Sequence, residues 1–199
     1  MKLYSMPSSG NSYKVRLLLA LLGQPVQTID VEYGSDTLTQ AKAETRLPLG
    51  KAPVLELDDG TLLPESNAIL VWLGQGTRFV PENALEKAQM LSWMFWEQNQ
   101  HEGVIAVRAA LLNYPHRKAQ ATPERLAELL VSGTGLLQIM DDHLRMRDWL
   151  VGGAATLADL CLYAYTHTAE TRGGFDLAPF PAVRDWLDRV AALPGYVAL

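Results

Sequence analysis

A cluster of small polar residues, Ser8-Ser9-Gly10-Asn11-Ser12, lies directly before a stretch that repeats apolar side chains at helical spacing. Serine and asparagine are preferred helix N-caps, so we expect a helix to begin here. Hydroxyl and backbone N–H groups would then gather at the positive end of the helix dipole, where a negative charge is stabilised. The cluster therefore indicates either an anion-binding site or a set of residues that only cap the helix.

A second polar pair, Glu65-Ser66, precedes a helical pattern over residues 69–73 that ends at Gly74. Taken alone, Ser66 is an N-cap and Glu65 is a solvated charge. The start of this helix is also a second place where backbone N–H groups can hold an anion.

The composition is that of an ordinary globular protein, with 48% hydrophobic and 20% charged residues. The chain has 22 acidic and 17 basic residues, which gives a net charge of −5. It therefore lacks the excess of basic residues that is typical of nucleic-acid-binding proteins. No apolar run approaches the roughly 20 residues of a membrane span, and residues 1–20 lack a signal-peptide cleavage pattern. The single cysteine, Cys161, excludes an intrachain disulfide. We therefore expect a soluble protein of the cytoplasm.

The first 76 residues have the pattern of a small α/β domain. A strand, a helix and a second strand come first, an order that implies two parallel strands joined by a crossover. Two further apolar runs flank the turn Asp58-Asp59-Gly60, which is the signal of a β-hairpin. The expected elements are strands over residues 2–6 and 26–31, helices over 13–22 and 37–46, strands over 52–57 and 62–63, and a helix after Ser66. This is a thioredoxin-like order.

Residues 77–82 are the expected linker, because Pro81 breaks regular structure and helical patterns follow Glu82. The remaining residues, 83–199, contain no convincing strand. The expected helices cover residues 85–112, 123–146, 157–171 and 181–192. The predicted fold has two domains: a thioredoxin-like α/β domain over residues 1–76, followed by an all-α helical domain.

Four short sequence motifs lie where these elements connect. They are SSGNSYKVR (8–16), PLGKAPVL (48–55), PESNAIL (64–70) and TLAD (156–159). In this order and at this spacing they resemble the cytosolic glutathione S-transferase family over essentially the whole chain, in particular its bacterial serine-type members. One departure is Leu47, where the family commonly has asparagine before the turn. The resemblance implies that the first domain binds glutathione, and that the helical domain builds most of the pocket for an electrophilic second substrate.

The resemblance also implies that residues of the serine cluster contact the thiol of bound glutathione. Ser9 falls where serine-type classes carry the serine that donates a hydrogen bond to the sulfur. Ser5 occupies the position of the catalytic tyrosine of other classes, so that mechanism is unavailable. Asn11 matches an asparagine that supports the thiol in some bacterial relatives with disulfide-reducing activity. Ser9 and Asn11 are the expected catalytic residues, with Ser12 as an alternative contact to the thiol.

The other glutathione contacts follow from the same resemblance. A cis Ala52-Pro53 bond would let the backbone of Ala52 pair, strand-like, with the cysteinyl part of glutathione. The alternative is an ordinary trans proline that opens an edge strand. Glu65 would accept from the γ-glutamyl amine, and Ser66 would bind the γ-glutamyl carboxylate. Lys51 would contact the glycyl end.

In the helical domain, the resemblance implies that Val107, Arg108 and Leu111 line the electrophile pocket. Gln98 and His101 share one helix face and would reach glutathione across the interface of a homodimer. An aromatic stripe earlier on this helix is more typical of a core or an interface.

Other polar residues of the helical domain are interpreted as structural. Thr156 and Asp159 form a capping box at the start of a core helix. Cys161 lies among apolar residues without a CxxC partner, and we expect it to be buried. The histidines have no plausible metal-ligand spacing, and no metal is expected.

The expected function is that of a glutathione transferase, in which Ser9 holds the glutathione sulfur as a thiolate that attacks hydrophobic electrophiles. A glutathione-dependent disulfide reductase or peroxidase would use the same site. An isomerase of the maleylacetoacetate type also uses an N-terminal serine, but its double serine is followed by cysteine, whereas Gly10 follows here. A non-enzymatic interaction module of the same fold is the remaining alternative.

Overall fold

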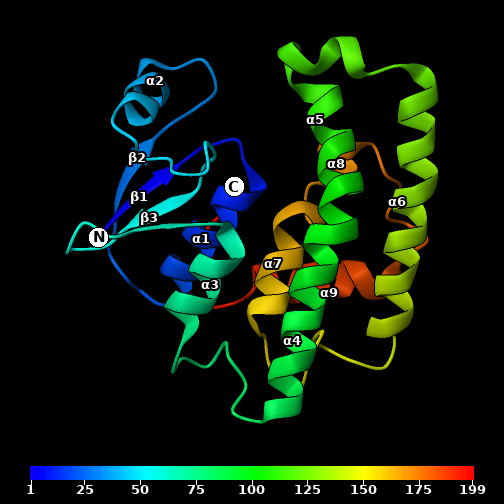
Figure 1. Ribbon diagram of the computed structural model, residues 1–199. Coiled ribbons are helices and arrows are strands. Elements are labelled where there is room, and N and C mark those ends of the chain that lie inside the picture. Colours follow the sequence, from blue (N-terminus) through cyan, green and yellow to red (C-terminus); the bar gives the residue numbers. More distant parts are fainter. The chain divides into compact units, whose positions relative to one another are not determined.

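In the computed structural model, which describes residues 1–199, the chain opens with strand β1 (Lys2–Ser5), helix α1 (Gly10–Leu21) and strand β2 (Gln27–Asp30) (Figure 1). Strands β1 and β2 are parallel, with Leu3 opposite Thr28. Helix α1 is the crossover between them, and nine of its residues are buried. The predicted strand–helix–strand opening is confirmed.

Strands β3 (Val54–Glu56) and β4 (Leu62–Pro64) are antiparallel and complete a sheet of order β2-β1-β3-β4. The hairpin turn depends on Gly60, whose φ of 85° favours glycine, and on a hydrogen bond from Thr61 N to Asp59 Oδ1 (2.9 Å). Since β3 also pairs antiparallel with β1, the chain enters the sheet beside β1 directly after Pro53.

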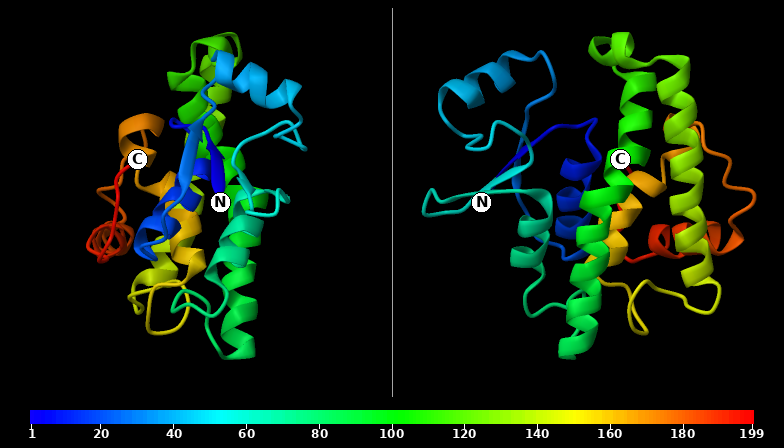
Figure 2. Two further views of the ribbon diagram at one scale, coloured as in Figure 1. Left: turned by 90° about the vertical axis from the view of Figure 1, so that its left-hand side faces the viewer. Right: turned by 45° about the vertical axis from the view of Figure 1, so that its right-hand side comes forward.

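Helices cover both faces of this sheet (Figure 2). Helix α2 (Asp36–Ala43) lies over the face that presents Tyr4 and Val54, and these side chains share one hydrophobic cluster with Ala41. Helices α1 and α3 (Ser66–Gly74) pack against each other on the opposite face. Because strand side chains alternate, Leu3 and Leu55 point to that second face and are fully buried. The packing of α1 on α3 brings the two helix starts together.

The C-terminal segment belongs to the first compact unit, which comprises Met1–Val80 and Leu193–Leu199. The sequence analysis had placed residues 193–199 in the helical domain. The physical reason for the difference is local: the Tyr13 hydroxyl donates to Val197 O (2.7 Å), and Gly195 approaches Ala20 so closely that a Cβ would lie 3.0 Å from the Ala20 carbonyl oxygen. An apolar pattern along the chain does not reveal such a return.

The second unit, Pro81–Ala192, is entirely helical. Its elements are α4 (Ala84–Trp96), a π-helical segment (Glu97–Ala106), α5 (Val107–Asn113), a 3₁₀ segment (Pro115–Gln120), α6 (Pro123–Leu144), α7 (Leu157–Thr166), α8 (Ala169–Gly173) and α9 (Pro181–Ala191). The predicted fold class, a small α/β domain followed by an all-α domain, is confirmed. No helix combines the length and the apolar composition that crossing a bilayer requires.

The helix predicted over residues 157–171 is two helices, α7 and α8. At the end of α7 the Thr166 hydroxyl donates to Leu162 O (2.8 Å), and His167 Nδ1 lies 2.8 Å from Tyr163 O. Side chains that occupy helix carbonyls in this way compete with continuation of the backbone ladder. No glycine or proline lies between residues 157 and 171, so the sequence pattern carries no signal for this break.

The predicted capping box at the start of α7 is confirmed and is part of a larger network. Asp159 is fully buried and accepts hydrogen bonds from Thr156 N (2.8 Å), the Thr156 hydroxyl (3.0 Å), Leu150 N (3.0 Å) and Trp186 Nε1 (2.9 Å). Burial raises the pKa of the Asp159 carboxyl above its ordinary value, and the four donors act in the opposite direction. One carboxyl group thus ties α7 to α9 and to the loop after α6.

Cys161 is fully buried, as predicted. It also has a polar partner, because its thiol donates to Glu97 Oε2 (3.3 Å) in the π-helical segment. Glu97 is itself fully buried and accepts from Gln98 Nε2 (2.8 Å). The pairing joins α7 to the long helical segment.

Candidate functional site

The loop between β1 and α1 is held in one conformation by its own backbone and by Arg16. Ser9 N donates to Met6 O (3.0 Å), and Met6 N donates to the Ser12 hydroxyl (3.0 Å). Arg16 reaches back from α1 to donate to the Ser5 hydroxyl (2.5 Å) and to Pro7 O (3.0 Å). Burial lowers the pKa of Arg16, but a guanidinium stays protonated at any physiological pH. The loop therefore presents the start of α1 with little freedom.

The serines of this loop have different environments. Ser8 is bound to Glu32 through both its N–H (3.0 Å) and its hydroxyl (2.9 Å). Ser12 and Ser5 are fully buried. Ser9 is half-buried and is the N-cap of α1, where its oxygen accepts a long hydrogen bond from Ser12 N (3.4 Å). An oxygen that accepts as a cap keeps its hydroxyl proton for another acceptor.

The starts of α1 and α3 are joined by a direct hydrogen bond. The Ser66 hydroxyl donates to Asn11 Oδ1 (3.1 Å), and Ser66 is buried. The structure thus brings together three of the predicted site residues, Ser9, Asn11 and Ser66. Because the Ser66 hydroxyl is directed to Asn11, its backbone N–H is the group left to bind a carboxylate.

Glu65 has a backbone conformation that L-amino acids rarely adopt, with φ 71° and ψ 115°. It is exposed and precedes α3, and no side chain caps this helix. Uncapped N–H groups in a first turn attract an anion, and a carboxylate beside them attracts a cation. Strain of this kind is found where the backbone is held for a purpose other than stability. The pair of charges matches a zwitterionic ligand group.

The Ala52–Pro53 peptide bond is cis, as the family resemblance implied. Pro53 is buried and Val54 begins β3, whereas Lys51 is exposed. Ala52 therefore stands just outside the ladder, at the point where the chain enters the sheet.

One residue near the paired helix starts was missed by the sequence analysis. Lys14 of α1 is fully buried, and its Nζ lies 3.5 Å from Asn67 Oδ1 in the first turn of α3. This contact is a second polar link between α1 and the first turn of α3. The sequence does contain a signal for this residue, because Lys14 lies on the side of α1 where Tyr13 and Leu17 are buried in the core.

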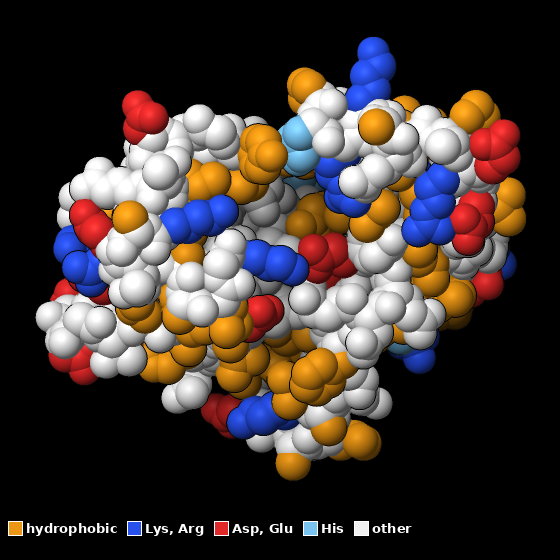
Figure 3. Space-filling view, turned by 45° about the horizontal axis from the view of Figure 1, so that its top comes forward, with side chains coloured by type: hydrophobic (Ala, Val, Ile, Leu, Met, Phe, Trp, Pro, Cys, Tyr) orange, Lys and Arg blue, Asp and Glu red, His pale blue; other side chains and the backbone are white.

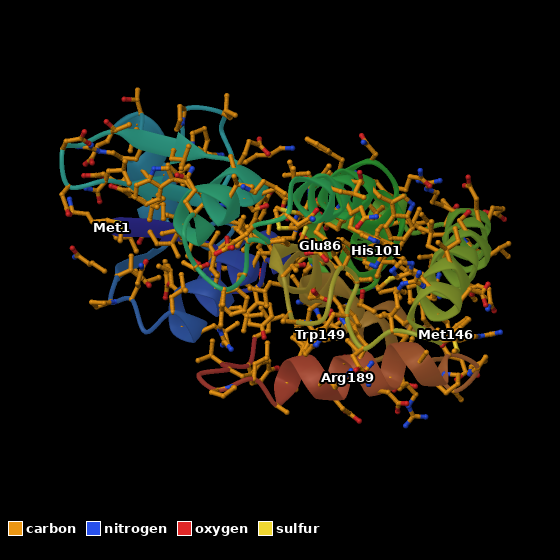
Figure 4. The ribbon with its side chains drawn as sticks, turned by 90° about the horizontal axis from the view of Figure 1, so that it is seen from below. Met1, Glu86, His101, Met146, Trp149 and Arg189 are labelled. Atoms are coloured by element: carbon orange, nitrogen blue, oxygen red, sulfur yellow. The ribbon has the colours of Figure 1, made fainter.

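The predicted residues of the helical unit lie in different environments. His101 of the π-helical segment, labelled in Figure 4, is fully buried, and its Nε2 lies 3.0 Å from the Thr166 hydroxyl. Gln98 is exposed and donates to Glu97 and to Glu102 (2.6 Å). The expected contact to a second subunit therefore rests on Gln98 more than on His101.

Of the residues expected in the electrophile pocket, Arg108 has a structural role. Its Nε donates to Gly173 O (2.7 Å) and its Nη1 to Leu126 O (2.5 Å), which links α5 to α8 and α6. Burial lowers the pKa of Arg108 without discharging it. Val107 is half-buried and Leu111 is buried, and Leu111 lines a hollow at the end of α5. No group of three or more His, Cys, Asp or Glu side chains is placed to hold a metal ion.

Comparison with known proteins places this arrangement in one family. Residues 3–77 match the N-terminal domain of the glutathione S-transferases, and residues 104–194 match their C-terminal domain. A glutathione S-transferase from Xanthobacter autotrophicus Py2 is 42% identical and has a TM-score of 0.90, covering 100% of this chain and 95% of that one.

More distant relatives extend the comparison. The disulfide-bond oxidoreductase YfcG of Escherichia coli K12 is 27% identical over 97% of this chain and 91% of its own length. A glutathione transferase family member from Pseudomonas fluorescens Pf-5, solved with two glutathione molecules bound, is 20% identical with a TM-score of 0.83, covering 98% of this chain and 89% of that one. This last likeness shows the fold alone. The chain therefore belongs to the glutathione S-transferase family.

Proposed function

We propose that this protein is a serine-type glutathione transferase that binds glutathione at the paired starts of α1 and α3. The observation that carries the proposal is the 3.1 Å bond from Ser66 to Asn11, which fixes both helix starts beside the Ser9 hydroxyl. Two converging helix dipoles and a hydroxyl donor favour a thiolate over a thiol. Because a free thiol has a pKa of about 8.5, a reduction of two units needs about 2.7 kcal/mol. A charge-assisted hydrogen bond together with the dipoles can supply that amount.

The reaction follows from the thiolate. The glutathione sulfur attacks an electrophilic carbon and forms a C–S bond, while the leaving group departs with the electron pair of the broken bond. The thiol proton is released to solvent, because the Ser9 hydroxyl is a hydrogen-bond donor and not a base. The protein contributes thiolate stabilisation and proximity. We further propose that the protein is a homodimer and acts in the cytoplasm.

The rest of glutathione is held by groups that match its charges. Glu65 accepts from the γ-glutamyl amine, and the uncapped N–H groups of α3, including that of Ser66, bind the γ-glutamyl carboxylate. Ala52 pairs with the cysteinyl backbone beside the cis Pro53, and Lys51 is exposed where it can meet the glycyl carboxylate.

Calorimetric titration tests the binding half of the proposal. Glutathione is compared with cysteinylglycine, which keeps the thiol but lacks the γ-glutamyl group. We expect glutathione to bind and cysteinylglycine to bind at least tenfold more weakly, since charge-assisted hydrogen bonds contribute about 1.5–3 kcal/mol each. Equal affinities for the two compounds would show that Glu65 and Ser66 do not bind the γ-glutamyl group. Absence of glutathione binding would favour the non-enzymatic interaction module.

Replacement of Glu65 by glycine should separate stability from binding. Glycine tolerates the positive φ of this position, so we expect Glu65→Gly to leave the free energy of unfolding unchanged or to raise it by up to about 1 kcal/mol. Glutathione affinity should fall about tenfold or more, because the acceptor for the amine is lost. Glu65→Gln, which keeps an acceptor oxygen and the strain, is the matched control and should bind with intermediate affinity. Unchanged affinity of Glu65→Gly would contradict the assigned role.

A disulfide reductase at the same site is the second proposed function. The observation in its favour is Asn11, which lies two residues after Ser9 and accepts a hydrogen bond from Ser66, together with the similarity to the E. coli disulfide-bond oxidoreductase. In that reaction the bound thiolate attacks the glutathionyl sulfur of a mixed disulfide, which yields glutathione disulfide and releases the second thiol. A kcat for reduction of a glutathionyl mixed disulfide that is higher than the kcat for transfer of glutathione to chlorodinitrobenzene would favour this function.

A further inference from the structure

The Ser66 hydroxyl is a buried polar group with a defined partner. Ser66 is the first residue of α3 and is only 4% exposed, whereas Ser9 and Asn11 at the start of α1 are half-buried. A buried hydroxyl needs a hydrogen-bond acceptor, and that of Ser66 has Asn11 Oδ1 at 3.1 Å. A ligand that claimed this hydroxyl would have to break a bond inside the protein. The half-buried amide of Asn11 is the side of the pair that a ligand can meet.

The bond from Ser66 also sets the direction of the Asn11 amide. The oxygen and the nitrogen of an amide are attached to the same carbon and point to different sides of it. Because the oxygen of Asn11 accepts from Ser66, the nitrogen faces away from Ser66. An amide nitrogen carries two N–H donors, so when one of them is engaged within the protein the other can still donate to a ligand. Asn11 therefore offers a donor, and not an acceptor, to a ligand atom beside Ser9.

A second contact between the two helices keeps Ser66 in register with Asn11. Lys14 follows Asn11 by three residues on α1, and its Nζ lies 3.5 Å from Asn67 Oδ1. Two consecutive residues of α3 thus meet two residues that are one turn apart on α1. A rotation of α3 that moved Ser66 away from Asn11 would also separate Asn67 from Lys14.

Local donors of this kind matter because the surface charge of the protein does not favour an anion. The net charge is −5, and acidic and basic side chains are interspersed on the face that Figure 3 shows. Such a surface gives no broad positive field. The charged groups nearest the helix starts are engaged in other contacts: Arg16 donates to Pro7 O, and Glu32 accepts from Ser8. Stabilisation of a thiolate here therefore depends on the groups that touch the sulfur.

We propose that the Ser66 hydroxyl is a positioning group, which turns the Asn11 amide so that its N–H donates to the glutathione sulfur beside Ser9. Ser66 then acts on the thiol through Asn11. The γ-glutamyl carboxylate is held by the backbone N–H groups at the start of α3, without the Ser66 hydroxyl. The inference rests on the proposed function, because it assigns roles toward glutathione bound at the paired helix starts. Two donors at one sulfur favour the thiolate more than one donor does.

Asn11→Asp tests the donor role, because aspartate has nearly the same shape as asparagine and still accepts from Ser66. It has no N–H groups, and it adds a negative charge beside the sulfur. Thiolate absorbance in the ultraviolet, followed as pH varies, gives the pKa of the bound glutathione thiol. We expect this pKa to rise by about one unit in Asn11→Ala and by more in Asn11→Asp, since a like charge disfavours the thiolate. An unchanged pKa in Asn11→Asp would show that Asn11 only links the two helices, and would overturn the inference.

Ser66→Ala tests the positioning role, because it keeps the backbone N–H and loses only the hydroxyl. We expect the pKa of the bound thiol to rise by about half a unit in Ser66→Ala. Ser66→Ala should add no further rise in the Asn11→Ala background, because Ser66 acts through Asn11. Equal rises in both backgrounds would overturn the inference. Asn67→Ala, which removes the other contact between α1 and α3, is the matched control and should leave the pKa unchanged. A rise in Asn67→Ala as large as that in Ser66→Ala would also contradict the assigned role.

Binding of S-methylglutathione tests the claim about the carboxylate. This compound has no ionisable thiol, so its affinity reports the γ-glutamyl contacts separately from the ionisation of the sulfur. Calorimetric titration should give an affinity for Ser66→Ala within about twofold of that of the unmodified protein. If the hydroxyl held the carboxylate instead, the affinity would fall about tenfold or more. That result, with an unchanged pKa of bound glutathione, would overturn the inference and leave the transferase function standing.

The same titrations separate a failure of this inference from a failure of the proposed function. A bound thiol that titrates like free glutathione in the unmodified protein overturns both. A lowered pKa that is lost in Ser9→Ala but kept in Asn11→Asp and Ser66→Ala overturns the inference alone, and leaves Ser9 as the donor. Thermal unfolding of each variant in parallel shows that the compared proteins are folded.

Discussion

Replacement of Ser9 by alanine should lower kcat for transfer of glutathione to chlorodinitrobenzene by about 10- to 100-fold. The Ser9 hydroxyl is the donor expected at the sulfur, and hydrogen bonds to a charged group contribute about 1.5–3 kcal/mol. Glutathione affinity should change much less, because the γ-glutamyl contacts of Glu65 and Ser66 remain. Steady-state kinetics at saturating glutathione measure kcat, and calorimetric titration measures the glutathione affinity.

Two controls make the Ser9 result specific. Ser8→Ala removes a neighbouring hydroxyl whose one proton is already donated to Glu32 and is therefore not available to the sulfur, so kcat should stay within about twofold. Ser9→Ala also removes the N-cap of α1, which costs about 1 kcal/mol of stability. Thermal unfolding in parallel shows whether the variant is folded at the assay temperature. Equal losses in Ser8→Ala and Ser9→Ala would contradict the assignment of the thiol to Ser9.

Replacement of Asp159 by alanine should lower the free energy of unfolding by about 3–5 kcal/mol. The substitution leaves Trp186 Nε1, two backbone N–H groups and the Thr156 hydroxyl without their buried acceptor. Each buried donor left unsatisfied costs about 1–3 kcal/mol, and losses within one network are not additive. Denaturant unfolding followed by tryptophan fluorescence measures the change.

Asp148→Ala is the matched control for Asp159→Ala. The Asp148 side chain is exposed, and its oxygen lies 3.9 Å from Arg189, so we expect a change of no more than about 0.5 kcal/mol. A loss in Asp159→Ala no larger than that in Asp148→Ala would show that the buried network does not stabilise the helical unit.

The fold could be predicted from the sequence because its signals are local. The Asp58-Asp59-Gly60 turn, the apolar periodicity of the helices and the Thr156/Asp159 capping box each follow from neighbouring residues. The features that were missed depend on distant residues. The break between α7 and α8 falls where no glycine or proline marks it, and the return of residues 193–199 involves a contact with Tyr13.

The candidate site shows the same division. The serine cluster and the Glu65-Ser66 pair are visible as helix starts, and their resemblance to a family orders them into one site. The bond from Ser66 to Asn11 could not be predicted, because it depends on the packing of α1 on α3, and no glycine or asparagine marks the positive φ at Glu65. The bridging role of Arg108 could not be predicted for a related reason: its partners, Gly173 and Leu126, are remote in the sequence.

The ionisation of bound glutathione tests the central claim most directly. Thiolate absorbance in the ultraviolet is followed as pH varies, with the unmodified protein saturated with glutathione and with Ser9→Ala under the same conditions. In the unmodified protein we expect the pKa of the bound thiol to lie about two units below the value of a free thiol, which is near 8.5. In Ser9→Ala we expect this pKa to rise most of the way back to the free value. A bound thiol that titrates like free glutathione in the unmodified protein would contradict the account, because the paired helix starts and Ser9 would then hold glutathione without activating it.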